Sequence, residues 1–441
     1  MLTDELKKTI QEAYRQFLDV KSLKARYGQR LMIAHIARTL GGIKRNQEHQ
    51  RGGGDHLCVI EAGTGTGKTL AYALAAVPIA KACDKTLVIS TATVALQEQI
   101  IYRDLPDVLT NSGLHFSISL SKGRRRYICL SKLDQLLSGA DAKVLPLYID
   151  EHMAAPDAES LSLYTDFAKQ MATGKWAGDR DDWKTVIADD KWARVTTDHA
   201  QCTGRRCSHV KQCSFFKARE SLTQADVIVA NHDLVLADLA LGGGAILPPP
   251  EECIYVFDEA HHLPDKVINH FSANFRLAAT ERWMEQIERA LSAMIALPVM
   301  DNNIRSELES LLSQLIAVRR GLIPLRPVLE DLLDGAQERQ GIKSVRFADG
   351  IVPAVLTEHA KSLLAGFSEV IKQSEKIIDS LQDGMDNNEL SGNREANEQW
   401  LTTVSMARFR AESAGALWRS YASDATKEKP PNARWMALVE A

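Results

Sequence analysis

The first part of the chain alternates short apolar runs with segments of helical spacing. Apolar runs that predict strands occur at residues 57–60, 86–90, 115–120, 227–230 and 254–257. Several segments between them carry apolar side chains at intervals of three and four, as helices do. Residues 1–20 also predict a helix, with Leu2, Leu6, Ile10 and Phe17 on one face. This βαβ rhythm predicts an α/β fold in which helices cover a parallel sheet.

The pattern changes at about residue 264, after which long helices are expected. Apolar positions three and four apart predict helices at residues 279–297, 304–318, 355–381 and 396–421, and strand signals nearly vanish. Turn and capping residues at 300–303 and 382–388 are expected to separate these helices. Residues 430–438 form a last short segment that could return to the first sheet.

Composition and charge place the chain among ordinary globular proteins. Its 441 residues, 45% hydrophobic and 25% charged, are enough for two or three domains. No run of about 20 apolar residues exists and the first segment lacks a signal-peptide core, so a cytoplasmic location is expected. Seven cysteines in such a chain do not suggest a disulfide framework. A net charge of −4 excludes a uniformly basic coat but leaves room for a local basic patch at residues 122–127.

A glycine-rich segment directly follows the first apolar run. It comprises Glu61, Ala62, Gly63, Thr64, Gly65, Thr66, Gly67, Lys68 and Thr69. Closely spaced glycines let successive backbone N–H groups turn toward a phosphate at a helix N-terminus, where the helix dipole favours negative charge. We therefore expect an ATP site, with Lys68 on the β- and γ-phosphates and the Thr69 hydroxyl on Mg²⁺.

An acidic pair directly follows the apolar run at residues 254–257. Asp258 is expected to hold the same Mg²⁺, and Glu259 to orient or deprotonate the attacking water. His261 is interpreted as a coupling residue rather than a base. Each motif alone could be a structural turn or a helix cap, and a small-molecule kinase is the more serious alternative. The order Asp-Glu-Ala-His favours an NTPase of the helicase type.

Three of the seven cysteines gather in one polar, loop-like segment. Cys202, Cys207 and Cys213 lie there, and Cys129 follows the basic patch much earlier in the chain. Because polar loops give thiols no packing reason to cluster, the four cysteines predict a metal site. One remote cysteine with a Cys-x4-Cys-x5-Cys trio favours an iron–sulfur cubane, and zinc is the alternative. His209 is interpreted as a surface residue.

Four further segments stand in a fixed order around these motifs. They are residues 26–30 (RYGQR), 90–99 (STATVALQEQ), 123–129 (GRRRYIC) and 229–232 (VANH). The whole set resembles the DinG branch of the XPD-like iron–sulfur DNA helicases of superfamily 2. The first segment is similar to the adenine-reading Q motif with Gln29, and the second to motif Ia, which touches DNA. The third and fourth resemble the start of the family's cluster domain and the strand that returns from it.

The resemblance implies a domain plan. A RecA-like ATP-binding motor domain would comprise residues 1–116 and 216–263, with residues 430–441 as a candidate returning segment. Residues 117–215 would form an iron–sulfur domain in which Cys129, Cys202, Cys207 and Cys213 bind a 4Fe–4S cluster. That domain is expected to depend on its metal because its sequence offers little core. Residues 264–429 would form a helical arch, although periodicity alone suits a generic helical bundle for protein contact equally well.

The resemblance also implies an activity. An intact protein of this family would hydrolyse ATP, move 5′→3′ along single-stranded DNA and unwind forked duplex DNA. The cluster domain and the arch would enclose one DNA strand. Tyr127 would either stack on a base or pack in a core. Phosphate contacts are expected from the basic side chains of the patch, namely Lys122, Arg124, Arg125 and Arg126.

One family feature is not found in the sequence. The second RecA-like domain, with its Ser-Ala-Thr motif and its late arginine motif, does not occur among the 441 residues. We therefore expect a second motor domain to be supplied in cis or in trans, and the chain alone to unwind poorly. The alternative is a non-motor module that binds ATP and DNA, which the presence of Glu259 argues against. A nuclease is disfavoured because no further carboxylate cluster has metal-ligand spacing.

Overall fold

The computed structural model forms two compact units. It describes residues 2–43, 52, 56–138, 156–199, 201–298, 301–334, 336–339, 342–387, 390, 394–423 and 432–438. The first unit comprises Met1–Arg126 and Ser214–Ser272, and the second comprises Tyr127–Cys213 and Ala273–Ala441. Each unit is therefore built from two separate stretches of the chain.

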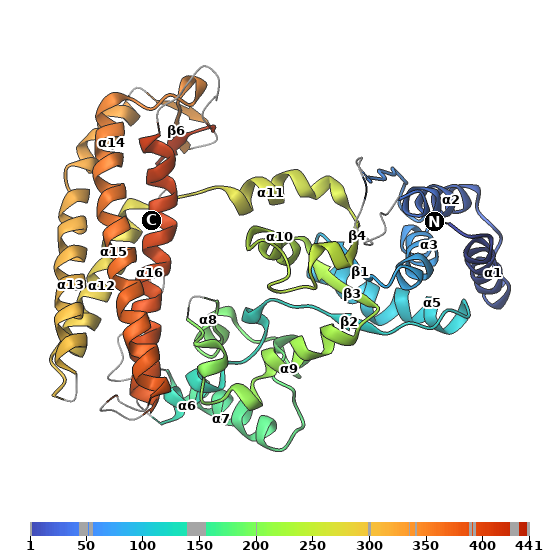
Figure 1. Ribbon diagram of the computed structural model, residues 1–441, viewed down its shortest axis with the longest axis horizontal. Coiled ribbons are helices and arrows are strands. Elements are labelled where there is room, and N and C mark those ends of the chain that lie inside the picture. Colours follow the sequence, from blue (N-terminus) through green and yellow to red (C-terminus); the bar gives the residue numbers. More distant parts are fainter. Residues whose placement is uncertain are drawn as a thin grey trace. The chain divides into compact units, whose positions relative to one another are not determined.

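A parallel sheet forms the centre of the first unit (Figure 1). Its strands are β1 (Thr86–Thr91), β2 (Ile118–Leu120), β3 (Val227–Asn231) and β4 (Cys253–Phe257), in the order β2-β3-β1-β4. All three pairings are parallel, and Leu87 of β1 lies opposite Val227 on one side and Ile254 on the other. Parallel sheets need both faces covered, which explains the apolar runs in β1 and β3. The α/β prediction is confirmed.

Eight α-helices accompany this sheet. They are α1 (Asp4–Val20), α2 (Tyr27–Gly41), α3 (Lys68–Ala82), α4 (Val94–Gln99), α5 (Leu105–Asn111), α9 (Ser214–Glu220), α10 (His232–Ala240) and α11 (Leu263–Phe271) among the described residues. Helix α3 is buried from Ala71 to Ala80 because it packs between the sheet and other helices. The predicted first helix is confirmed, and its Ile10 and Phe17 are buried.

The apolar run at residues 57–60 does not form a strand, which corrects the prediction. The segment is irregular, and the side chains of Leu57 and Val59 are 76% and 84% exposed. An apolar run becomes a parallel strand only where a neighbouring strand and a covering layer are present. Here only Ile60 packs partly against the core.

The cysteine-bearing stretch of the second unit is made of short elements. Its described α-helices are α6 (Leu130–Leu137), α7 (Ala158–Ala172) and α8 (Asp189–Ala193), and turns and short 3-10 segments follow α7. Phe167 is fully buried, and its ring lies 5.1 Å from that of Trp176 and 4.7 Å from that of Trp183. This stretch therefore has an aromatic core of its own, and the prediction that it has little core is wrong. Widely spaced aromatic side chains bury large areas without forming a long apolar run.

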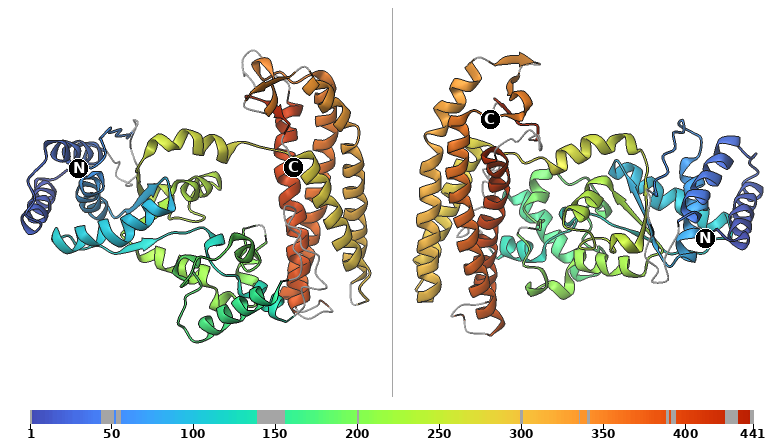
Figure 2. Two further views of the ribbon diagram at one scale, coloured as in Figure 1. Left: turned by 180° about the vertical axis from the view of Figure 1, so that it is seen from behind. Right: turned by 45° about the horizontal axis from the view of Figure 1, so that its top comes forward.

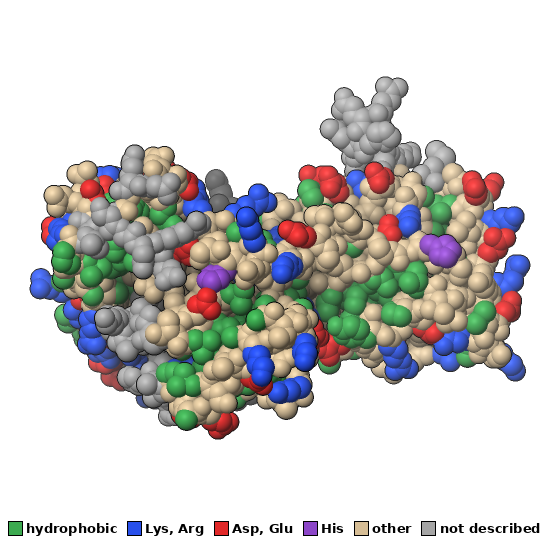
Figure 3. Space-filling model, turned by 90° about the horizontal axis from the view of Figure 1, so that it is seen from below, with side chains coloured by type: hydrophobic (Ala, Val, Ile, Leu, Met, Phe, Trp, Pro, Cys, Tyr) green, Lys and Arg blue, Asp and Glu red, His purple; other side chains and the backbone are tan. Residues whose placement is uncertain are grey.

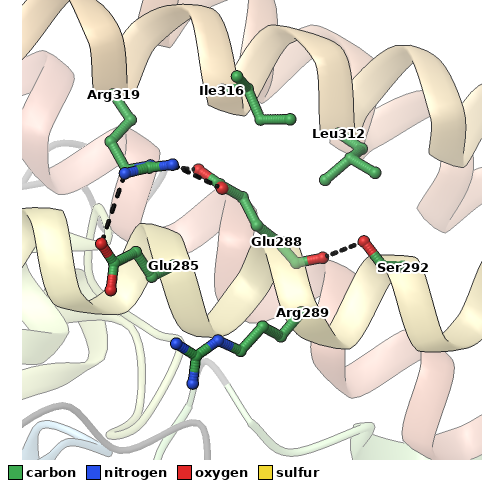
Figure 4. Close-up of a pocket in the computed structure, with 7 residues that line it drawn as sticks. All are labelled: Glu285, Glu288, Arg289, Ser292, Leu312, Ile316 and Arg319. Carbon is green, nitrogen blue, oxygen red and sulfur yellow. Dashed lines mark hydrogen bonds and ion pairs between the residues drawn. The ribbon is translucent and has the colours of Figure 1, made fainter.

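Long helices form the rest of the second unit, and Figures 1 and 2 show α13, α15 and α16 side by side. The helices are α12 (Leu277–Ile295), α13 (Asn302–Leu322), α14 (Leu325–Asp334), α15 (Ala354–Asp386) and α16 (Arg394–Ala422). Their apolar faces share one core, so the four predicted helices are confirmed. Between α12 and α13, Arg319 contacts Glu288 at 2.7 Å and Glu285 at 3.4 Å (Figure 4).

Two details of this helical region differ from the prediction. Helix α15 continues through residues 382–386, and Leu390 packs so close to Gly384 that a Cβ atom there would collide with it. The C-terminal segment forms β7 (Trp435–Ala437), which pairs with β6 (Ile342–Arg346), and β6 also pairs with β5 (Gln337–Arg339). The last strand thus belongs to a small antiparallel sheet in the second unit and does not return to the parallel sheet. None of the described helices is long and apolar enough to cross a membrane.

Candidate nucleotide site and cysteine site

The glycine-rich segment forms an irregular loop that ends at the start of α3. Gly65 and Gly67 have φ angles of 74° and 80°, in the left-handed region that favours glycine. Gly67 is the N-cap of α3 and Lys68 its first residue, so the free N–H groups of the first helical turn face the loop. This is the arrangement of a phosphate-binding helix N-terminus. Thr69 lies in the same first turn.

The start of α2 holds this loop in place. The Arg26 guanidinium donates to the Gly65 carbonyl at 2.5 Å. Gln29 is buried, its Oε1 accepts from the Tyr14 hydroxyl at 3.1 Å, and its amide lies so close to Gly67 that a Cβ atom there would collide with it. Gln29 therefore contacts the loop itself in this structure.

The acidic pair lies at the carboxyl end of β4. The Asp258 N–H donates to the Ser90 carbonyl at 2.7 Å, which continues the strand pairing into the site. Glu259 follows with a φ of 53°, a left-handed conformation that is uncommon for a residue with a side chain. Its carboxylate lies 2.9 Å from Lys68 Nζ. The fold thus joins the glycine-rich loop and the acidic pair, which are far apart in the sequence.

The two carboxyl groups have different electrostatic environments. Burial, and then the neighbouring Glu259, raise the pKa of Asp258. The Lys68 ammonium lowers the pKa of Glu259 through their hydrogen bond. The hydroxyl of Tyr72 donates to Asp258 Oδ2 at 3.4 Å. A buried acid beside an ionised one is suited to hold a cation, because the positive charge offsets both burial and repulsion.

His261 lies beside the pair rather than within it. Its Nδ1 is 3.4 Å from Glu259 Oε2, and its side chain is 67% exposed. Its ring centroid is 4.1 Å from that of His262. The imidazole can therefore contact the Glu259 carboxylate from solvent.

The segment similar to motif Ia begins at the end of β1 and forms α4. Thr93 caps this helix by accepting from the Leu96 N–H at 3.2 Å. Gln97 is buried, and its amide donates to the Ser121 carbonyl at 2.9 Å and to the Val229 carbonyl at 3.3 Å. These bonds fix α4 against β3 and the end of β2.

The basic patch is less exposed than its sequence suggests. Lys122 and Tyr127 are each 7% exposed, so the core-packing alternative for Tyr127 holds in this structure. The Arg124 guanidinium lies 4.2 Å from the centre of the Phe215 ring, and Arg219 approaches the same ring at 5.6 Å. On the face drawn in Figure 3, Lys and Arg side chains are interspersed with Asp and Glu side chains.

The four cysteines all belong to the second unit. Burial raises the pKa of the Cys129 thiol to about 11, and the Cys202 and Cys207 thiols act on it in the same direction. Burial likewise raises the pKa of Cys207. The three thiols are thus near enough to influence one another, although no three Cys, His, Asp or Glu side chains of the described chain are grouped closely enough to hold a metal ion.

Backbone N–H groups point at three of these sulfur atoms. The Gly204 N–H donates to Cys202 Sγ at 3.4 Å. The backbone of Lys132 and that of His209 donate to Cys129 and Cys207, and each of these bonds favours the thiolate. Such bonds stabilise negative charge on a metal-bound sulfur. The side chain of His209 lies 3.4 Å from the Asp134 carboxylate.

The comparisons with known proteins agree with the motif order. A family model described as DEAD_2 matches residues 191–279, which contain three of the four cysteines and the acidic pair. An ATP-dependent DNA helicase DinG of Photobacterium profundum is 35% identical over 438 residues, which cover 99% of this chain and 60% of that protein. The chain is thus similar to a DinG helicase over nearly its whole length.

The similarity to DinG extends over both compact units but not over the whole length of the relatives. DinG of Salmonella typhimurium is 32% identical over 452 residues, covering 98% of this chain and 58% of that protein. DinG of Escherichia coli is 38% identical over 266 residues, covering 60% of this chain and 35% of that protein. The chain thus spans about three fifths of the length of the DinG proteins that match nearly all of it.

Two contacts of this chain were missed by sequence reasoning. One is the ion pair between Lys68 and Glu259. The other joins buried His232, at the start of α10, to the hydroxyl of Ser90 at 2.7 Å. The available signal for His232 was its position, since a polar residue directly after a buried strand often lies at a site.

Proposed function

We propose that this chain binds ATP with Mg²⁺ and single-stranded DNA and is the ATP-hydrolysing part of a DinG-type DNA helicase. The observation that carries the proposal is the 2.9 Å contact between Lys68 of the phosphate loop and Glu259 beside Asp258. It brings a phosphate-binding cation and a candidate water-orienting carboxylate to one edge of a parallel sheet, where ligands of α/β proteins bind. The helicase activity named for the relatives supports the proposal.

Each residue of the site has a distinct role in this proposal. The backbone of Gly63, Thr64, Gly65, Thr66 and Gly67 cradles the phosphates. Lys68 exchanges its bond with Glu259 for a bond to the β- and γ-phosphates, and Gln29 reads the adenine edge. Thr69 and Asp258 hold Mg²⁺. Glu259, released by Lys68, orients the attacking water. His261 contacts the Glu259 carboxylate and couples it to neighbouring parts of the protein.

A pair of variants tests this assignment. Lys68→Ala should weaken ATP binding, because Lys68 contacts the ground-state phosphates. Glu259→Gln should keep ATP binding and abolish turnover in any complete form of the enzyme, because Glu259 acts on the water. ATP affinity and phosphate release would be measured with and without single-stranded DNA, with Lys184→Ala as a surface control. Equal loss of ATP binding in both variants would contradict the role of Glu259. Tight ATP binding without turnover even when the second motor domain is supplied would favour the non-motor alternative.

We also propose that Cys129, Cys202, Cys207 and Cys213 bind a 4Fe–4S cluster. The three N–H···S bonds and the mutual influence of the thiols support this donor set. Such a cluster needs one thiolate for each iron and absorbs light broadly near about 400 nm. Anaerobically purified protein should contain iron and sulfide, and Cys207→Ser should lose both. Colourless protein with stoichiometric zinc would contradict the cluster.

The proposed domain plan assigns DNA contacts to separate parts of the chain. Residues 1–116 and 216–263 would be the motor domain, residues 117–215 the cluster domain and residues 264–429 the arch. The exposed part of the basic patch would contact DNA phosphates. A second motor domain, in cis or in trans, would be required for 5′→3′ movement along DNA. Binding to single-stranded DNA should weaken steeply with salt, as phosphate contacts require. Salt-independent binding would contradict these contacts.

A further inference from the structure

A buried histidine lies beneath the acidic pair. His232 follows β3 directly and is 0% exposed. Its Nδ1 lies 2.7 Å from the Ser90 hydroxyl on β1, and its ring centroid is 5.9 Å from that of Phe257 on β4. One imidazole thus contacts three neighbouring strand ends, including the strand that carries Asp258 and Glu259.

The surroundings of the ring define which nitrogen carries the proton. Burial lowers the pKa of His232 and keeps the ring neutral, with Lys266 acting in the same direction. The backbone of Glu259 and Asp258 acts in the opposite direction, as does Asp233. The backbone of the acidic turn therefore lies close to the ring. A neutral imidazole has one donor and one acceptor nitrogen, so with Nδ1 accepting from the Ser90 hydroxyl the proton lies on Nε2.

Nε2 is buried and has no hydrogen-bond partner of good geometry among the described residues. The backbone of Glu259 and Asp258 nevertheless lies close enough to the ring to act on its pKa, so the nearest acceptors belong to the acidic turn. The Lys68–Glu259 ion pair also holds this turn, with Glu259 in its left-handed conformation. Buried donors left unpaired are costly, and a small shift of the turn toward His232 would pair this one.

We propose that His232 is a positioning residue that secures the Asp258–Glu259 turn once Lys68 has left Glu259 for the nucleotide. This inference rests on the proposed function. In the nucleotide-bound state, Nε2–H bonds a backbone carbonyl of the turn, and the bond from Ser90 keeps the ring in the required tautomer. The Asp258 carboxylate is thereby fixed where Mg²⁺ binds. A role in packing alone would need neither nitrogen.

The test compares ATP affinity with Mg²⁺ and with a chelator. His232→Leu introduces an apolar side chain of similar length that has neither a hydrogen-bond donor nor an acceptor. His232→Gln retains both a donor and an acceptor. We expect His232→Leu to reduce the gain in affinity that Mg²⁺ provides by about tenfold, as loss of one hydrogen bond allows. Affinity in the chelator should change less than about twofold. His232→Gln should restore most of the gain.

Two further measurements make each outcome decisive. Ser90→Ala is a second variant in case His232→Leu does not fold. We expect it to reduce the increase in ATP affinity that Mg²⁺ provides by a smaller factor than His232→Leu does. Nitrogen NMR of the unaltered chain should find the proton on Nε2. Equal loss of affinity with Mg²⁺ and with chelator, or a proton on Nδ1, would overturn the inference. Failure of the unaltered chain to bind ATP at all would instead overturn the proposed function.

Discussion

The parallel-sheet unit and the cysteine-bearing stretch Tyr127–Cys213 hold their candidate sites in opposite ways. In the first unit, short aliphatic strands and α3 form the core, and the site residues lie at strand ends and at a helix N-terminus. In the cysteine-bearing stretch, aromatic rings form much of the core. Three of the thiols lie in loops or at the ends of short 3-10 segments, and Cys129 is the N-cap of α6. One site is positioned by regular elements and the other by local backbone bonds.

The difference shows what each site needs from its surroundings. The nucleotide site needs only correct strand order, because parallel strands deliver their carboxyl ends to the same edge. The cysteine site needs support from outside its own stretch. Glu398, a buried residue of α16, accepts from the Ser208 N–H at 2.9 Å and from its hydroxyl at 3.3 Å, directly beside Cys207. A distant helix thus anchors the loop that carries the thiols.

The largest expected effect is a loss of stability in the cysteine-bearing stretch that leaves the core of the first unit intact. Phe167→Ala should destabilise the cysteine-bearing stretch by about 3–5 kcal/mol, because it removes a fully buried ring. ATP affinity, a property of the other unit, should change little. Tryptophan fluorescence and ATP binding would be measured together, with Val186→Ala as the exposed control. Parallel loss of both signals would show that the two units do not fold independently.

The second prediction concerns thiol reactivity in metal-free protein. A pKa of about 11 leaves Cys129 almost entirely as the unreactive thiol at pH 8, with about one molecule in a thousand ionised. Its alkylation by iodoacetamide should therefore be at least about a hundredfold slower than that of exposed Cys58. Peptide mass spectrometry would follow both rates. Similar rates would mean that Cys129 is not buried in solution.

The third prediction tests the anchor on α16. Glu398→Ala should raise hydrogen exchange at the Ser208 amide and cost about 1–3 kcal/mol, because a buried N–H loses a charged acceptor. Glu398→Gln keeps an acceptor and should lose less. Glu412→Ala, at an exposed ion pair of the same helix, is the matched control. Unchanged exchange at Ser208 would show that the cysteine loop is held by local bonds alone.

The smallest expected effect lies in the nucleotide site. Tyr72→Phe removes one long hydrogen bond to Asp258 and should cost about 0.5–1 kcal/mol or less. Because that bond lowers the pKa of Asp258, its loss should raise this pKa further. Asp258 must be ionised to hold Mg²⁺, so Mg²⁺-dependent ATP binding should be lost at a higher pH as the solution is acidified. A shift toward lower pH would contradict the role of Tyr72.

Prediction from sequence succeeded where spacing within one segment decides the structure. The apolar period located α12, α13, α15 and α16, and strands β1, β3 and β4, because a helix face or a buried strand must be apolar along its own length. It failed at residues 57–60, where the run was apolar but no layer covers it. It also failed for the aromatic core, whose members are spread between residues 128 and 195.

The sequence by itself determined the chemistry that this protein can offer: a glycine-rich loop with Lys68, an acidic pair, and four cysteines in polar surroundings. Only the tertiary structure decided how these groups meet. The Lys68–Glu259 pair, the contact of His232 with Ser90, and the anchor from Glu398 to Ser208 all join residues that are far apart in the chain. The spacing of residues within one segment does not predict such contacts, because they depend on strand order and on how separate helices pack. The sequence supplies the groups, and the packing of the whole unit sets the distances between them.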